Sequence, residues 1–154
     1  METLNSKKQV EILNDLLQIN NDRIVGYEHA RNELSDNKDD DLKELFKRMI
    51  NKSVDNNESL ERLIDLYNGE PAAGTSGMGK VYRAWMDVKA LFSGGNRKAI
   101  LDSCETGDAA ALRAYADALY EEDLGKDVRE LIIMQKEALY NDFIQIRALK
   151  EAAS

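Results

Sequence analysis

The sequence has few of the residues that cross-link a chain or bind transition metals: one cysteine (Cys104) and one histidine (His29) among 154 residues. A single thiol cannot form an intrachain disulfide framework or a cysteine-rich zinc site, and this usage is typical of a reducing, cytoplasmic setting. There is also only one proline, Pro71. Because most of the chain is free of this helix breaker and rich in helix-forming residues, we expect an all-α protein.

Positive charge is also scarce, since 21 Lys and Arg residues stand against 29 Asp and Glu, a formal net charge of −8. A protein that binds nucleic acid needs surplus cations to displace counterions from phosphates, so we expect no nucleic-acid partner. No run approaches the roughly 20 apolar residues of a membrane-spanning helix. The N-terminus also lacks the apolar segment of a signal peptide. These absences predict a cytoplasmic protein without a membrane span.

Apolar residues recur at helical spacing in four long segments and one short one. Glycine-rich or polar stretches separate these segments and lack the apolar period. The expected helices cover residues 7–34, 41–67, 78–92, 97–120 and 128–149.

The two halves of the chain carry a similar pattern at an offset of 88 residues, in which Tyr27 corresponds to Tyr115 and Gly26 to Ala114. This similarity predicts two helical hairpins. Short loops join the helices of each pair, whereas the crossover 69–96 is long enough to return the chain along the bundle. We therefore expect one domain, residues 1–154: a four-helix bundle with a short fifth helix in the crossover and the second and third long helices parallel.

Polar residues interrupt the apolar stripes at the middle of the expected bundle. Their positions are Asn20, Ser53, Asn56, Glu105, Asp108, Gln135 and Asp142. A carboxylate buried without a partner costs several kcal/mol, so this layer requires protonation, a hydrogen-bond network, water or a bound cation.

Two interpretations of this polar layer remain open. The first is a hydrogen-bonded network that fixes helix register, joined by the hydroxyls of Tyr27 and Tyr115, with no cofactor and no catalytic residue. The alternative is a site for iron or another divalent metal. Its ligands would be Glu105, Asp108, Asp142, Asn20 and Gln135.

Two further features have both a functional and a structural interpretation. Residues 74–81 match the phosphate-binding pattern G-x-x-x-x-G-K, but Val81 replaces the usual Ser or Thr, so we interpret the segment as a flexible connector. The basic segment 80–98 contains Trp85 and could dock on a membrane or a partner. We expect instead that Trp85 covers the protein's own bundle or the same surface of a second copy.

Several motifs resemble a known family: Leu13–Leu17, Asn20–Arg23, Gly26–Glu28, Trp85–Lys89 and Cys104–Asp108. They are similar to a bacterial family of ferritin-like four-helix-bundle proteins, known as a domain of unknown function of type 2383. The resemblance extends from about residue 13 to residue 148. It implies a ferritin-like topology, a bacterial source and a stress-associated role.

Pattern and resemblance together predict a non-enzymatic structural or interaction protein that forms a homo-oligomer such as a dimer. The alternative function is that of a metal-binding ferritin-like protein, which handles iron or acts as an oxidase through the polar layer. The sequence does not identify a catalytic residue.

Overall fold

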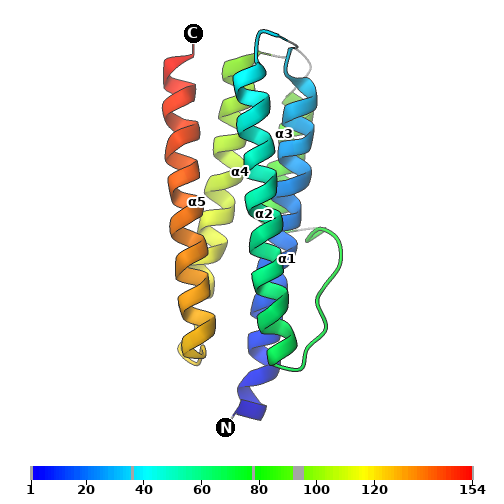
Figure 1. Ribbon diagram of the computed structural model, residues 1–154, viewed down its shortest axis with the longest axis vertical. Coiled ribbons are helices and arrows are strands. Elements are labelled where there is room, and N and C mark those ends of the chain that lie inside the picture. The colour runs from blue at the N-terminus through cyan, green and yellow to red at the C-terminus, as the bar shows by residue number, and fades with distance from the viewer. Residues whose placement is uncertain (1, 36, 78, 92–95, 154) are drawn as a thin grey trace.

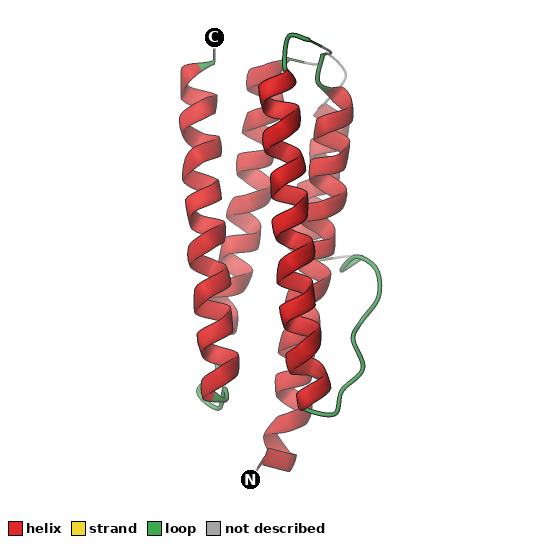
Figure 2. Ribbon diagram, viewed as in Figure 1, coloured by secondary structure: helices red, strands yellow, loops and turns green. Residues whose placement is uncertain are grey.

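The computed structural model describes residues 2–35, 37–77, 79–91 and 96–153, and within these ranges it contains helices and no β-strand (Figures 1 and 2). The helices are α1 (Glu2–Glu33), α2 (Asp40–Leu66), α3 (Lys80–Leu91), α4 (Arg97–Ala118) and α5 (Lys126–Ala152). The predicted all-α helical bundle is thereby confirmed. None of these helices combines enough length and apolar character to cross a membrane, as far as the described residues show.

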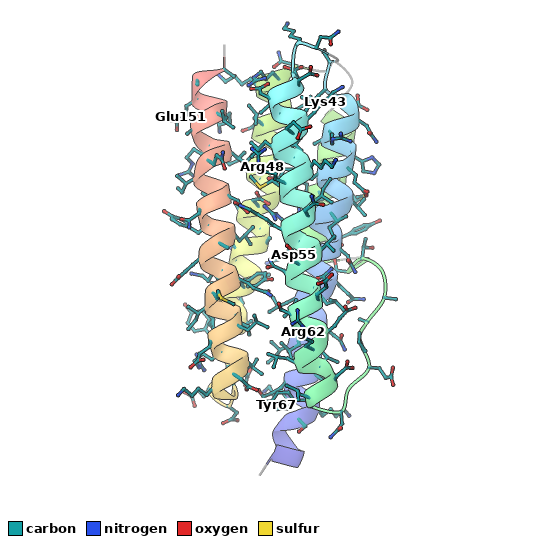
Figure 3. The ribbon with its side chains drawn as sticks, in the orientation of Figure 1. Lys43, Arg48, Asp55, Arg62, Tyr67 and Glu151 are labelled. Carbon is teal, nitrogen blue, oxygen red and sulfur yellow. The ribbon has the colours of Figure 1, made fainter. Side chains whose placement is uncertain are left out.

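The four long helices lie side by side along one axis, and the chain changes direction at each connection (Figure 1). Helices α1 and α5 run one way, and α2 and α4 run the other, so α2 and α4 are parallel as predicted. The return path between them consists of the connector after α2 and then α3, which packs against α1 and α4. Charged side chains such as Arg48, Arg62 and Glu151 extend from the outer surfaces (Figure 3).

Helix α3 is held in place by Trp85, whose side chain is fully buried. The indole lies against Gly26 of α1 and Gly107 of α4, and a Cβ atom at either glycine would overlap it. The Tyr27 ring packs on the same indole, with ring centroids 5.0 Å apart. Trp85 therefore covers the protein's own bundle, which was the expected interpretation. Residues 92–95 of the basic segment lie outside the described part of the chain.

The connector after α2, residues 67–77, is named the strap here, because side chains of α1 hold it along the bundle. Asn14 donates from Nδ2 to the Glu70 carbonyl at 3.0 Å and accepts from the Ala72 N–H at 2.7 Å. Asp22 accepts from the backbone N–H of Ser76 at 2.9 Å and from its hydroxyl at 2.6 Å. Polar groups of α1 thus bind the segment that was expected to be a connector and that has few apolar side chains.

Replacing Asp22 with Ala is expected to release the strap around Ser76. Asp22 is buried, and the substitution leaves the Ser76 N–H and hydroxyl without their acceptor, which costs about 1–3 kcal/mol. We expect faster cleavage within residues 74–77 in limited proteolysis. Glu11→Ala, an exposed change on the same helix, is the control, and equal cleavage rates for the two variants would contradict this role of Asp22.

Candidate functional site

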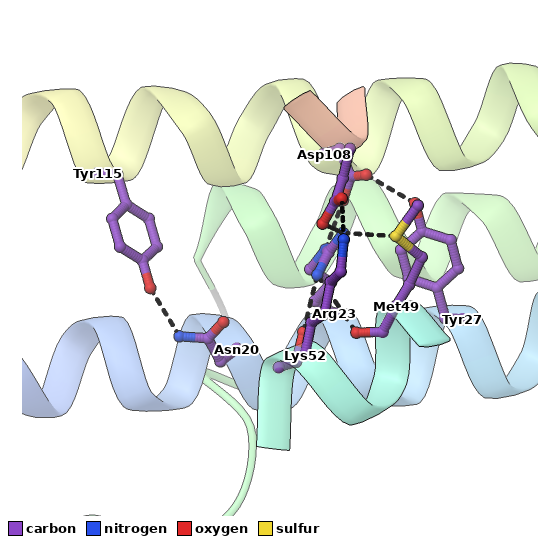
Figure 4. A network of polar contacts seen from close by, with 9 residues as sticks. Asn20, Arg23, Tyr27, Met49, Lys52, Asp108 and Tyr115 are labelled. Atoms are coloured by element: carbon purple, nitrogen blue, oxygen red, sulfur yellow. Dashed lines mark hydrogen bonds and ion pairs between the residues drawn. The ribbon is translucent and has the colours of Figure 1, made fainter. Parts of the chain in front are cut away.

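The polar layer is organised around Arg23 of α1, whose side chain is only 2% exposed. Its Nε donates to Asp108 Oδ1 of α4 at 2.8 Å, and Nη2 donates to Asp142 Oδ2 of α5 at 3.3 Å. Nη1 donates to the Ser53 hydroxyl of α2 at 2.9 Å. One guanidinium thus connects all four long helices, since its planar donors point in several fixed directions (Figure 4).

The two carboxylates that contact Arg23 each have a second donor. Tyr27 donates its hydroxyl to Asp108 Oδ2 at 2.6 Å, and Lys52 donates to Asp142 Oδ1 at 2.7 Å. Burial raises the pKa of Asp108, while Arg23 and Tyr27 oppose the rise. Burial also lowers the pKa of Arg23, but Asp108, Tyr27 and Asp142 raise it by more, so the guanidinium stays charged. The cluster is therefore a buried salt bridge with its charges compensated from within the chain.

A second cluster lies beside the first and contains Asn20 and Tyr115, which Figure 4 shows, together with Gln135. Asn20 Nδ2 donates to the Tyr115 hydroxyl at 2.8 Å, and that hydroxyl donates to Gln135 Oε1 at 2.7 Å. Gln135 Nε2 donates in turn to the backbone carbonyl of Asn56 at 3.1 Å. Burial raises the pKa of Tyr115, which keeps the phenol protonated. The cluster is a continuous chain of neutral hydrogen bonds across all four long helices.

The internal repeat of the sequence reappears in these contacts. Tyr27 of α1 bonds to Asp108 of α4, and Tyr115 of α4 bonds to Asn20 of α1. The two pairs are related by the offset of 88 residues, because Tyr27 corresponds to Tyr115 and Asn20 corresponds to Asp108. The two hairpins therefore exchange equivalent tyrosine contacts across the α1–α4 interface. This confirms that both tyrosine hydroxyls join the polar layer.

Removing the Tyr115 hydroxyl is expected to weaken the second cluster. Tyr115→Phe leaves Gln135 Oε1 buried without its donor and removes one acceptor from Asn20, so we expect a loss of about 1–3 kcal/mol in the free energy of unfolding. Urea denaturation followed by circular dichroism measures it. Tyr140→Phe, whose ring is 52% exposed, is the matched control and should stay within about 0.5 kcal/mol. Equal losses would contradict the network.

Four of the five residues predicted as metal ligands lie in the polar layer, but not around one point. Asp108 and Asp142 belong to the Arg23 cluster, and Asn20 and Gln135 to the Tyr115 cluster. Glu105 lies apart, at the edge of the α4–α5 interface. It accepts from Arg147 and Lys150 of α5 at 2.8 and 2.6 Å.

The prediction that Glu105 shares the inward direction of Asp108 needs correction for a geometric reason. Residues three apart on a helix differ by about 60° in direction. Here Asp108 takes the central position, while Glu105 turns toward the two cations of α5. Although burial raises the pKa of Glu105, Lys150 and Arg147 lower it by more. Asn56 differs as well, since only its backbone carbonyl is bonded in the layer.

The donor set fits a divalent metal poorly, because Arg23 already lies between the two buried carboxylates. A metal ion would have to displace this guanidinium, leaving it buried and unpaired, or bind beside it against charge repulsion. In the described residues, no group of three or more His, Cys, Asp or Glu side chains is arranged to hold a metal. Metal binding by these residues stays a prediction.

Arg23, the central residue of the layer, is not among the polar residues expected from the sequence, because its neighbour Ile24 fits the apolar period of the helix. The structure buries Arg23 and leaves Ile24 half-exposed. Two signals were available. Asn20, Arg23 and Tyr27 have regular three-four spacing, and two buried carboxylates need a cation.

Two other reactive side chains are those of Cys104, beside Asp108, and His29. Cys104 is fully buried, and burial raises the pKa of its thiol, so it is a small core residue. His29 is half-buried on α1. Neither side chain is bonded to the polar layer in the described part of the chain.

Comparison with curated proteins gives no match to this chain. The family described as a domain of unknown function (DUF2383) matches residues 8–121, from the first turns of α1 to the loop after α4. The matched region includes Arg23, Tyr27, Asp108 and Tyr115, the α1 and α4 side chains at the centre of both polar clusters. The chain belongs to this family, DUF2383, a domain of unknown function.

Proposed function

We propose that this chain is a non-enzymatic structural protein that acts by association with a second copy of itself. The observation that carries the proposal is the mutual satisfaction of the polar layer, in which Arg23 is bonded to Asp108 and Asp142, and Tyr115 to Asn20 and Gln135. Groups bonded in this way are not directed at a substrate. Buried polar contacts of this kind select one helix register, which a stable interaction surface requires.

The surface proposed for association is the outer face of α5, defined by Ile133, Glu137, Tyr140, Ile144 and Arg147. Ile133 and Ile144 are each 39% exposed and Tyr140 is 52% exposed. These residues point away from the centre of the buried stripe of the same helix, and Arg147 lies at the edge toward α4, where it bonds to Glu105. A line of exposed apolar side chains on an otherwise charged protein is typical of an interaction site.

The proposed occupant is a second α5 in antiparallel orientation, because the outer face is self-complementary. Glu137, Tyr140, Ile144 and Arg147 follow one another at intervals of three, four and three residues. A two-fold axis level with residue 142 brings Tyr140 opposite Ile144 of the second copy, and Glu137 opposite its Arg147. Arg147 bonds to Glu105 through Nε, so its other guanidinium donors remain for such a contact. The result is an isologous interface with apolar and charged pairs matched.

This interface is small, so the dimer is expected to be weak. With the axis level with residue 142, the two helices overlap over about 30 Å and present faces about 10 Å wide, which gives roughly 600 Å² buried in total. Specific interfaces below about 1,200 Å² are mostly transient. We therefore expect the dimer to dissociate in the micromolar range.

Sedimentation velocity over a wide concentration range tests the proposal. Ile144→Lys should weaken the dimer at least tenfold, whereas Val54→Lys, a change of similar exposure on α2, should not. Glu137→Arg should also weaken it, and the added change Arg147→Glu should restore it, because the exchanged charges again face each other. A monomer at every concentration, or equal effects of Ile144→Lys and Val54→Lys, would contradict self-association through α5.

A second candidate function is metal binding, for iron handling or an oxidase activity. The observation that favours it is the approach of Asp108 and Asp142 from two helices to a common cation. Elemental analysis of protein purified without chelator or affinity metal tests it. Stoichiometric iron, manganese or zinc that disappears in Asp108→Ala would support this function and overturn the non-enzymatic proposal.

The stress-associated role and the bacterial, ferritin-like affiliation come from the family resemblance alone and belong to the same proposal. Following the amount of the protein in its source cells during osmotic or oxidative stress tests the first. An unchanged amount under each condition would contradict a stress-associated role.

A further inference from the structure

The groove between α1 and α4 is only partly filled by α3. Trp85 occupies the groove along α3, but below the first turn of that helix a pocket of about 480 Å³ remains. Its walls come from α1, α3, α4 and the strap. The apolar part of the lining consists of Ile19, Val81, Ala110 and Ala114. The pocket can therefore accommodate an apolar group, as the adjoining part of the groove accommodates the indole of Trp85.

The charged residues of this pocket are separated by sign. Lys80 lies at the end formed by α3, and Arg113 lies in the first turn below Ala110. Asp117 is two turns below Ala110, because α4 descends from this end of the pocket. Asp15 is one turn below Ile19, because α1 ascends toward it. The pocket thus has cations toward the α3 end and carboxylates toward the other.

All four charged side chains are available to a ligand. Within the described residues, neither Lys80 and Arg113 nor Asp15 and Asp117 make a side-chain hydrogen bond or an ion pair. Burial, followed by the nearby Glu11, raises the pKa of Asp15, as expected for a carboxylate without a cationic partner. All four residues are exposed, so a ligand with the reverse arrangement of charges can pair with both ends of the pocket.

We propose that this pocket binds a short zwitterionic peptide of two or three apolar residues. Its C-terminal carboxylate lies toward Lys80 and Arg113, and its N-terminal ammonium lies toward Asp15 and Asp117. The apolar side chains of the peptide rest on the alanine-rich wall of α4.

The spacing of the charges selects this ligand class. Arg113 and Asp117, the cation and the carboxylate on α4, are about 6 Å apart along the helix axis, since they differ by four residues. An extended peptide spans about 3.3–3.6 Å per residue, so at least two residues are needed to reach from one charge to the other. A free amino acid is too short to reach both ends.

A nucleotide is disfavoured despite the G-x-x-x-x-G-K pattern that leads into the pocket. Asp15 and Asp117 would repel its phosphates, and the pattern begins within the strap that follows helix α2, rather than after a β-strand. This proposal concerns a different surface from the outer face of α5 and does not depend on dimerisation.

Isothermal titration calorimetry with defined probes tests the proposal. Ala-Leu and Ala-Ala-Leu should bind with dissociation constants below about 1 mM, a modest affinity for such small ligands. N-acetylated and C-amidated forms of the same peptides, and free leucine, should bind at least tenfold more weakly. No saturable heat with either free peptide, or equal binding of blocked and free forms, would overturn the proposal.

Variants of exposed pocket residues test which charge of the pocket binds which end of the ligand. Arg113→Gln should weaken the binding of the free peptide tenfold, so that the free and C-amidated peptides bind with equal affinity. Asp117→Asn should make the free and N-acetylated peptides bind with equal affinity. Lys47→Gln, on the exposed side of α2, should change neither. Unchanged affinities in both pocket variants, with melting curves like the parent protein, or preferential binding of ATP with magnesium, would contradict the assignment.

Discussion

Arg23→Met is expected to lower the free energy of unfolding by about 3–5 kcal/mol at neutral pH, because it leaves Asp108 and Asp142 buried without their shared cation. The methionine replaces much of the volume of the arginine, so loss of charge compensation dominates the effect. Urea denaturation followed by circular dichroism gives the magnitude. Arg48→Met, an exposed arginine on α2, is the matched control and should cost less than about 0.5 kcal/mol.

The loss in Arg23→Met should depend on pH in a defined direction. Burial already raises the pKa of Asp108, and without Arg23 that pKa rises further. A carboxyl whose folded pKa exceeds the unfolded value of about 3.9 destabilises the protein as the pH rises from that value toward the folded pKa. We therefore expect the deficit of the variant to be largest at neutral pH and to shrink on acidification toward pH 4.

Neutralising the carboxylates as well should recover most of the stability. In Arg23→Met/Asp108→Asn/Asp142→Asn no charge of the central cluster remains buried, and replacing a whole buried ion network is far cheaper than removing one member. If Arg23→Met cost no more than Arg48→Met, or if the triple variant were less stable than Arg23→Met, the central role of this salt bridge would be refuted.

Trp85→Ala is expected to cost about 3–5 kcal/mol, the usual range for removal of a large buried aromatic side chain. The indole Nε1 has no hydrogen-bond partner among the described residues, so the loss is one of packing rather than of a polar contact. Because the indole joins α3 to α1 and α4, we also expect faster amide hydrogen exchange in residues 81–86.

A double-mutant cycle with Gly26 identifies the cause. Gly26→Ala alone should destabilise by about 1–3 kcal/mol, because the added Cβ overlaps the indole. In the Trp85→Ala background the same change should be neutral, or stabilising by up to about 1 kcal/mol, since alanine favours helix over glycine. An identical effect of Gly26→Ala in both backgrounds would show that the indole is not the obstacle.

The helices and their order were predictable because hydrophobic periodicity is a local property of the sequence. The stripes containing Leu13, Phe46 and Leu139 identify three of the long helices, and Gly69 with Pro71 ends one of them. The crossover length correctly predicted that α2 and α4 run parallel. Even the polar layer and its tyrosines followed from interruptions of the apolar stripes at mid-height.

Which polar residues meet, and with what partner, depended on tertiary structure. Arg23 and Ile24 are neighbours in the sequence, and the helical period alone does not decide which of them faces the core. The positions of the carboxylates on α4 and α5 decide it. Glu105 is likewise directed by Arg147 and Lys150 of another helix. The strap follows α1 because of Asn14 and Asp22, which lie more than 50 residues away in sequence.

The sequence by itself thus determined the helical segments, their connections and the mid-height level of the polar groups, since these follow from spacing along the chain. Only the tertiary structure decided that the layer is a salt bridge around Arg23 next to a neutral hydrogen-bond chain. The physical reason is that a buried charge is stabilised by the nearest group of opposite sign in space, and four packed helices bring together residues that no local pattern relates.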